Sequence, residues 1–133
     1  MYSTTHFHST THEVLVITRG TARLRFGGED NPGGHTADVA TGDVLVVPAG
    51  VGHRLLEDTS SSSSSSPSSS TKSSLLPGPF EMVGSYPPGC SWDMCYGNEG
   101  EDGAKLESNI EQLEWFAQDP IYGHQGPAID SHY

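Results

Sequence analysis

The amino-acid sequence predicts an all-β fold, a barrel or jelly roll, because short strand patterns follow one another between glycine-containing turns from Glu13 to Glu57. The clearest pattern is Thr21–Phe26, where apolar and polar side chains strictly alternate, as expected of a strand with one buried face. Residues 44–47 form a continuous apolar run of strand length that Pro48 ends. Strands this short and regular are typical of an all-β barrel.

Further strands are predicted from the same kind of pattern. One is the β-branched apolar run that follows Glu13 and stops at Arg19-Gly20. The others are short runs bounded by Gly, Pro or Asp turns. In chain order these predicted strands are residues 14–17, 35–40, 53–56 and 80–86.

One short helix is predicted towards the C-terminal end, from Ala104 to Ala117. Apolar side chains recur there at helical spacing, Asp102 can cap the first turn, and Asp119-Pro120 ends the pattern. Residues 118–133 are rich in Gly and Pro, so we expect a coil tail.

A serine-rich segment interrupts the strand pattern at residues 59–74. Ser60 to Ser66 is an unbroken serine run, and such a segment cannot bury enough apolar surface to offset its ordering entropy. We therefore expect a disordered insertion within a single domain that spans residues 1–133.

The charge balance argues against several classes of partner. Seventeen acidic residues stand against six basic ones, giving a net charge of −11, and no basic stretch is present. Nucleic-acid backbones and anionic membrane surfaces attract clustered Lys and Arg, so neither is an expected partner. No apolar run reaches the roughly 18 residues of a membrane span, and the first residues lack a signal-peptide pattern, which together predict a cytoplasmic protein.

The candidate functional residues are histidines and one glutamate. His6 and His8 are two residues apart, so on a β-strand both side chains point to the same face. Glu13 follows them, and His53 comes from a separate Pro/Gly turn. Imidazole nitrogens and a carboxylate are ligands that proteins use for a catalytic divalent metal, with positions left for water, substrate or dioxygen. The pattern therefore favours a metal site.

Two spacings in the chain resemble the motifs of the cupin superfamily. The first cupin motif has HxH, a glutamate after a short interval and a glycine after six more residues, and it is similar to His6, His8, Glu13 and Gly20. The second has a glycine, a PxG turn after five residues and a histidine after two more, and it is similar to Gly42, Pro48, Gly50 and His53.

The resemblance narrows to the small, uncharacterised YjlB-like cupins of bacteria and fungi. Their recurring strings are similar to residues 8–15, 26–29, 48–53, 92–95 and 119–123, so the resemblance covers most of the chain outside the serine tract. It implies a cupin-type jelly-roll β-barrel with the metal inside. Glu57 departs from the family pattern, which usually has Asn there, but that Asn is not a metal ligand.

The resemblance implies His6, His8, Glu13 and His53 as ligands of a divalent ion such as Fe, Mn, Zn or Ni. On a straight strand Glu13 would point away from His8, but the cupin pattern places a turn in residues 9–12, so that Glu13 opens the next strand. Two alternatives stay open: His12 replaces Glu13 as a ligand, or the barrel holds no metal. With Glu13 as ligand, we expect His12 to orient a ligand or to meet substrate.

Several activities are compatible with such a site, which can act as a Lewis acid, activate water or, with Fe(II), bind dioxygen. Cupins include dioxygenases, isomerases, decarboxylases and non-catalytic binders, so the fold alone does not choose between them. We expect a metal-dependent enzyme of oxygenase or isomerase type acting on a small organic molecule. The alternative is a non-catalytic cupin that binds a small ligand. Tyr86, Trp92 and Asp93 could line the pocket mouth, or they could serve packing alone.

A third interpretation concerns the start of the chain. In the family one or more strands precede the HxH motif, whereas here the motif begins at residue 6. If those N-terminal strands are lacking, the barrel has an open edge and the chain is a truncated, functionally impaired family member. Pairing into a homodimer, which is common among cupins, would instead cover that edge.

Overall fold

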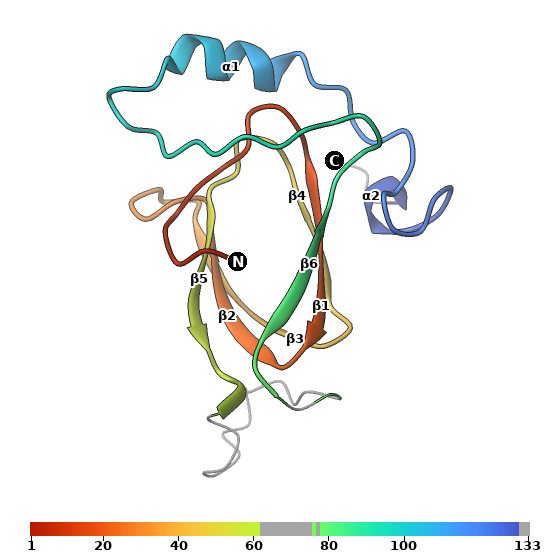
Figure 1. Cartoon of the computed structure of the whole chain (residues 1–133). Coiled ribbons are helices and arrows are strands. Elements are labelled where there is room, and N and C mark those ends of the chain that lie inside the picture. Colours follow the sequence, from red (N-terminus) through yellow and green to blue (C-terminus); the bar gives the residue numbers. More distant parts are fainter. Residues whose placement is uncertain (62–75, 77, 131–133) are drawn as a thin grey trace. The chain divides into compact units, whose positions relative to one another are not determined.

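The computed structural model describes residues 1–61, 76 and 78–130. Figure 1 labels the elements of this described part, which are β1 (Glu13–Arg19), β2 (Thr21–Phe26), β3 (His35–Ala40), β4 (Val44–Val47), β5 (His53–Asp58), β6 (Glu81–Ser85), α1 (Gly103–Glu111) and α2 (Pro127–Asp130). Every predicted strand is confirmed, with bounds close to the expected ones.

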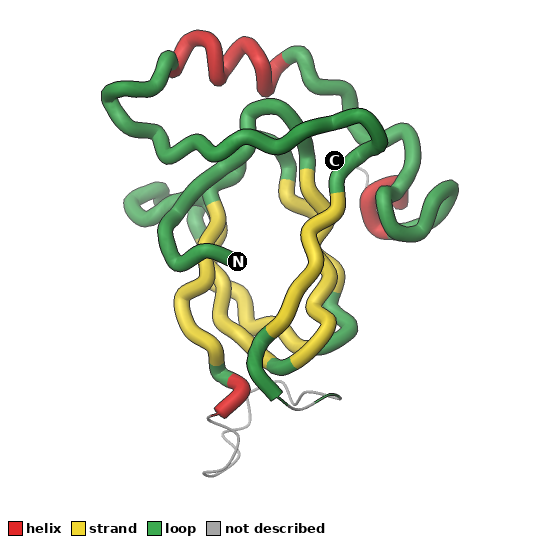
Figure 2. The backbone as a smooth tube through the Cα atoms, in the orientation of Figure 1, coloured by secondary structure: helices red, strands yellow, loops and turns green. Residues whose placement is uncertain are grey.

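The strands form two three-stranded sheets, ordered β3-β2-β5 and β4-β1-β6. Figure 2 shows that strands make up most of the regular structure of the chain before the loop that leads into α1, with one short helical turn directly after β5. The mostly-strand content confirms the predicted all-β class, with a short helix towards the C-terminal end.

The described residues group into two compact units. The first comprises Met1–Thr5, Val16–Asp43 and His53–Val83. The second comprises His6–Leu15, Val44–Gly52 and Gly84–Tyr133. Strands β2, β3 and β5 belong to the first unit, β4 and both helices belong to the second, and β1 and β6 contribute residues to both.

In the first unit, β2 is the central strand of the antiparallel sheet β3-β2-β5. Ala22, Leu24 and Phe26 are buried, which confirms the face predicted from the alternation along this strand. The register pairs Phe26 with His35 of β3 on one side and with His53 of β5 on the other. The pairing with β2 therefore determines where His53 begins its strand.

A tight glycine turn joins β1 to β2. Gly20 has a φ of +74°, in the left-handed region that side-chain-bearing residues rarely adopt. A β-carbon at this position would lie 2.7 Å from the carbonyl oxygen of Gly78 and would also collide with the hydroxyl of Ser60. That hydroxyl instead accepts the backbone N–H of Thr21 at 3.0 Å. Glycine at the end of the first motif is thus required by both conformation and space.

The second unit is built around an apolar cluster from β1, β4 and the C-terminal part of the chain. Its members are Val14, Phe116 and Ala128, with Val44, Val46 and Ile129 packed against them. Burial of these side chains gives the free-energy gain that holds distant parts of the sequence together in this unit.

Helix α1 is shorter than predicted, because it ends at Glu111 rather than at Ala117. Its start is as expected, with the Asp102 side chain accepting a backbone N–H of the first turn. Beyond the helix, Phe116 is buried in the apolar cluster, and the ring N–H of Trp115 donates to a backbone carbonyl of α2 at 2.8 Å. Packing of these two aromatic side chains outweighs the helical spacing on which the prediction rested.

The predicted coil tail contains the short helix α2, which is a second difference from expectation. Buried Asp119 explains it, since its carboxylate accepts backbone N–H groups from Ile121 at 2.8 Å, Tyr122 at 3.0 Å and Ala128 at 3.0 Å. These bonds close the turn that precedes α2 and satisfy a donor in its first turn.

Most of the predicted disordered insertion, residues 62–74, lies outside the described residues, as do residues 131–133 of the predicted tail. Within the part that is described, neither helix has the length and apolar character needed to cross a membrane.

Candidate metal centre

His6 and His8 lie in the segment before β1, and both are buried. Phe7, between them, forms an isolated antiparallel bridge with Cys95 through backbone hydrogen bonds of 2.9 and 3.0 Å. This extended pairing directs the side chains of His6 and His8 to one side and that of Phe7 to the other, as the spacing predicts. The two histidine ring centroids are 5.5 Å apart.

Glu13 opens β1 after a turn in residues 9–12, as the cupin pattern implies. Its side chain is buried, and its carboxylate oxygen Oε2 lies 3.4 Å from Nε2 of His8. The other oxygen, Oε1, accepts the hydroxyl of Tyr86 at 2.8 Å. The second unit therefore brings two predicted ligands into contact and adds Tyr86, which directly follows β6.

The second ring nitrogen of His8, Nδ1, is in hydrogen-bonding contact with the backbone carbonyl oxygen of Asp93. A carbonyl oxygen only accepts, so Nδ1 carries a hydrogen, and in the neutral ring Nε2 presents its lone pair towards Glu13. Burial lowers the pKa of His8, but hydrogen bonds and charges from Glu13 and Asp93 outweigh burial and raise that pKa above its ordinary value. The environment of this ring therefore favours a positive charge.

The contact between His8 and Glu13 fits a metal ion. When the ring is neutral, two acceptors, Nε2 and Oε2, face each other across 3.4 Å, which is favourable only with a cation nearby. Two ligands of a tetrahedral ion, each about 2.1 Å from it, lie about 3.4 Å apart. Imidazole nitrogen with carboxylate oxygen is also a donor set suited to divalent transition metals. The spacing and the chemistry of these two side chains agree.

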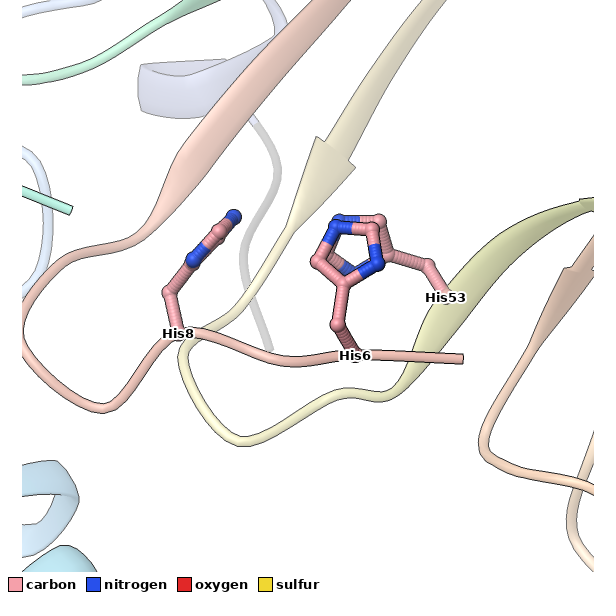
Figure 3. Close-up of side chains that lie close together, drawn as sticks. All are labelled: His6, His8 and His53. Atoms are coloured by element: carbon pink, nitrogen blue, oxygen red, sulfur yellow. The ribbon is translucent and has the colours of Figure 1, made fainter. Parts of the chain in front are cut away.

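His53, the first residue of β5, is 2% exposed. Among the described residues, His6, His8 and His53 each offer a ring nitrogen, and these nitrogens lie within 4.8 Å of one another (Figure 3). The three buried histidines could therefore hold a metal ion.

His12 is buried in a different setting. Its Nδ1 accepts the backbone N–H of Ala49 at 2.9 Å, and its ring packs against Trp115 and Phe116 with centroid distances of 4.8 and 5.4 Å. Burial lowers the pKa of His12, which favours the neutral ring that the bond to Ala49 requires. Among the described residues, the candidate metal cluster consists of His6, His8 and His53 and includes neither His12 nor Glu13.

Asp93 connects the loop after β6 to the first motif. Its carboxylate accepts the backbone N–H of Ser9 at 2.7 Å, the Ser9 hydroxyl at 2.5 Å and the Cys95 thiol at 3.2 Å. Burial raises the pKa of Asp93, but these hydrogen bonds outweigh it and lower that pKa to about 2. Burial and the neighbouring Asp93 raise the pKa of Cys95 to about 11, so its thiol stays protonated at neutral pH.

The sequence is similar to a known protein family and to a bacterial protein. Residues 2–63 match the family model described as a cupin domain. The chain is also similar to the uncharacterized protein YjlB of Bacillus subtilis (strain 168), with 39% identity over 127 residues. The match covers 94% of the chain and 62% of YjlB, so the chain spans less than two thirds of that relative's length. No solved structure gives a significant match.

Proposed function

We propose that this chain, whose residues 2–63 match the cupin family model, is a divalent-metal-binding cupin. The metal ligands are His6, His8, Glu13 and His53. The strands form a jelly-roll barrel, and the domain converts a small organic molecule in a metal-dependent reaction of oxygenase or isomerase type. The metal is Fe, Mn, Zn or Ni.

The observation that carries this proposal is the contact of 3.4 Å between Nε2 of His8 and Oε2 of Glu13. Because the Asp93 carbonyl accepts a hydrogen bond from Nδ1 of His8, the lone pair of the neutral ring is on Nε2. This lone pair and the carboxylate of Glu13 therefore face each other. A proton on His8 can neutralise this arrangement. A divalent ion would do so as well, and His6 and His53 would also hold it, since each offers a ring nitrogen within 4.8 Å of a ring nitrogen of His8.

A bound divalent ion supplies Lewis acidity, activates water or, as iron, binds dioxygen. The surrounding side chains orient the ligands for this chemistry. The hydroxyl of Tyr86 holds Oε1 of Glu13, which leaves Oε2 turned towards His8. Burial of the ligand side chains excludes bulk water and strengthens electrostatic interactions at the site.

Elemental analysis of protein purified without chelator tests the proposal. The wild type should retain a stoichiometric divalent metal, and His53→Ala should lower metal affinity by about tenfold or more, because a ligand is lost. His124→Ala is the matched control, since His124 is an exposed histidine and its removal should leave the metal in place. A wild type without metal, or a His53→Ala variant with unchanged metal content, would contradict the proposal.

Binding without turnover is the second candidate function, and one observation favours it. Both carboxylates next to His8 are already engaged: Glu13 accepts from Tyr86, and Asp93 accepts from Ser9. Neither is therefore a ready general base for substrate. A small molecule that raises the melting temperature of the metal-loaded protein but is recovered unchanged would support a binding role, whereas product formation that is lost in His53→Ala would support the enzyme.

A further inference from the structure

Residues 91–95, in the loop between β6 and α1, run beside the segment that carries the HxH motif. The backbone bridge between Phe7 and Cys95 lies at one end of this pairing. At the other end the hydroxyl of Thr10 donates to the carbonyl of Ser91 at 2.7 Å. The loop therefore supports the first motif along its length, within one compact unit.

Asp93 lies between these two ends and contacts two successive residues. Its carboxylate accepts both the N–H and the hydroxyl of Ser9, at 2.7 and 2.5 Å. Its backbone carbonyl accepts from Nδ1 of His8. Because one residue makes all three contacts, anchoring its side chain on Ser9 also determines where its carbonyl oxygen points.

We propose that Asp93 is a positioning residue for His8. By clamping Ser9, the carboxylate holds the Asp93 carbonyl against Nδ1 of His8 and keeps the ring in the tautomer that offers Nε2 to a divalent ion. This inference rests on the proposed metal-binding function. Asp93 acts through His8 and does not itself bind the ion. The hydrogen bond on the far nitrogen of a histidine ligand selects its tautomer and orients its ring.

Burial and a further hydrogen bond hold Ser9 in place beside Asp93. Ser9 is fully buried, and its hydroxyl also accepts the side-chain amide of Asn109, from α1, at 3.3 Å. Removal of the Asp93 carboxylate would leave two buried donors of Ser9 without their acceptor, which costs about 1–3 kcal/mol for each group. The segment would shift to avoid that cost, and the His8 contact would shift with it.

Two readouts test the proposal, one on metal-free protein and one on metal binding. Imidazole ¹⁵N NMR at alkaline pH, where the His8 ring is neutral, shows which nitrogen carries the hydrogen. Titration with Co²⁺, followed by the absorption of the bound ion, gives the affinity. The variants are Asp93→Ala, Asp93→Asn and Ser9→Ala. Asp102→Ala is the control, because it removes another carboxylate that accepts a backbone N–H, at the start of α1 in the same unit.

The wild type should carry the hydrogen on Nδ1 of His8. Asp93→Ala should show a mixture of tautomers and about 10- to 100-fold weaker Co²⁺ binding. Asp93→Asn keeps an oxygen for the N–H of Ser9 and offers an amide to its hydroxyl, so both readouts should stay near those of the wild type. Ser9→Ala should shift both readouts in the same direction as Asp93→Ala but by less. Asp102→Ala should leave both unchanged.

A wild-type His8 with its hydrogen on Nε2 would overturn the proposal without any variant. So would an Asp93→Ala protein with unchanged tautomer and unchanged Co²⁺ affinity, or an Asp93→Asn protein as impaired as Asp93→Ala. If Asp93→Ala does not fold, the proposal is tested by the tautomer of His8 in the wild type and by the tautomer and Co²⁺ affinity of Ser9→Ala. A wild type that binds no Co²⁺ but whose tautomer depends on Asp93 would refute the metal function and support the positioning role, so the two failures are distinguishable.

Discussion

Glu13 and Gly84 lie so close together that a β-carbon at position 84 would collide with Oε1 of the Glu13 carboxylate. The two residues belong to β1 and β6, neighbours in one sheet, and Tyr86 binds the same oxygen two residues further along. The carboxylate therefore occupies space that exists because position 84 has no side chain.

Gly84→Ala should displace Glu13 and weaken metal binding by about 10- to 100-fold. The loss should come from the collision alone, since Gly84 is not among the glycines with positive φ and alanine can adopt its backbone conformation. Gly100→Ala is the control, because a β-carbon there would meet no atom within 4 Å. Equal Co²⁺ affinities for Gly84→Ala and the wild type would show that Glu13 is not a ligand.

Tyr86→Phe should weaken metal binding while leaving the fold intact. The substitution removes the hydroxyl that holds Oε1 of Glu13 at 2.8 Å, and loss of such a partner of a metal ligand typically costs 10- to 100-fold in affinity, so we expect an effect of about that size. Competition with a chelator measures the affinity. Tyr122→Phe, at an exposed tyrosine, should leave it unchanged. An effect on melting temperature without one on affinity would argue that Tyr86 serves packing alone.

His12→Ala should destabilise the protein without removing its metal. The backbone N–H of Ala49 would lose its acceptor, and the packing against Trp115 and Phe116 would be lost, for a total of about 2–4 kcal/mol in unfolding free energy. Urea unfolding measures the stability, with His124→Ala, at an exposed histidine, as control. Loss of metal from folded His12→Ala protein would instead revive the alternative in which His12 replaces Glu13.

Asp119 should make the protein sensitive to acid. Burial raises the pKa of this carboxyl, but hydrogen bonds from Tyr122, Ile121 and Ala128 together outweigh burial and lower that pKa below its ordinary value of 3.8. Because the folded-state pKa is the lower one, the carboxylate stabilises the fold above pH 3.8, and this contribution is lost as the pH falls through the folded-state pKa.

Asp119→Asn should therefore be about 1–3 kcal/mol less stable than the wild type at pH 7, because the side-chain amide N–H of Asn would face a backbone N–H that the carboxylate now accepts. The difference should shrink as the pH is lowered below 3.8, and urea unfolding at several pH values measures it. The exposed Glu99→Gln substitution is the control and should follow the wild type. A difference that stays constant down to pH 2 would exclude Asp119 as the titrating group.

Local sequence patterns predicted the strands well, because the alternation in β2 and the apolar run of β4 each depend on the residues of a single strand. The same patterns predicted α1 to be too long, because Leu113 and Ala117 continue the helical spacing although the helix ends at Glu111. Burial of Phe116 in the apolar cluster that also contains Val14, more than a hundred positions away in the chain, outweighs that spacing.

The sequence by itself predicted the all-β class from strand periodicity, and its resemblance to the cupin motifs implied His6, His8, Glu13 and His53 as candidate ligands. Both kinds of pattern can be recognised without coordinates. Only the tertiary structure decided which atoms face one another. The Asp93 carbonyl lies 85 positions from His8 and the Tyr86 hydroxyl 73 positions from Glu13, so no spacing could connect them. Such partners are selected by how separate segments pack, because a hydrogen bond requires its donor and acceptor to meet within about 3 Å, wherever they lie in the chain.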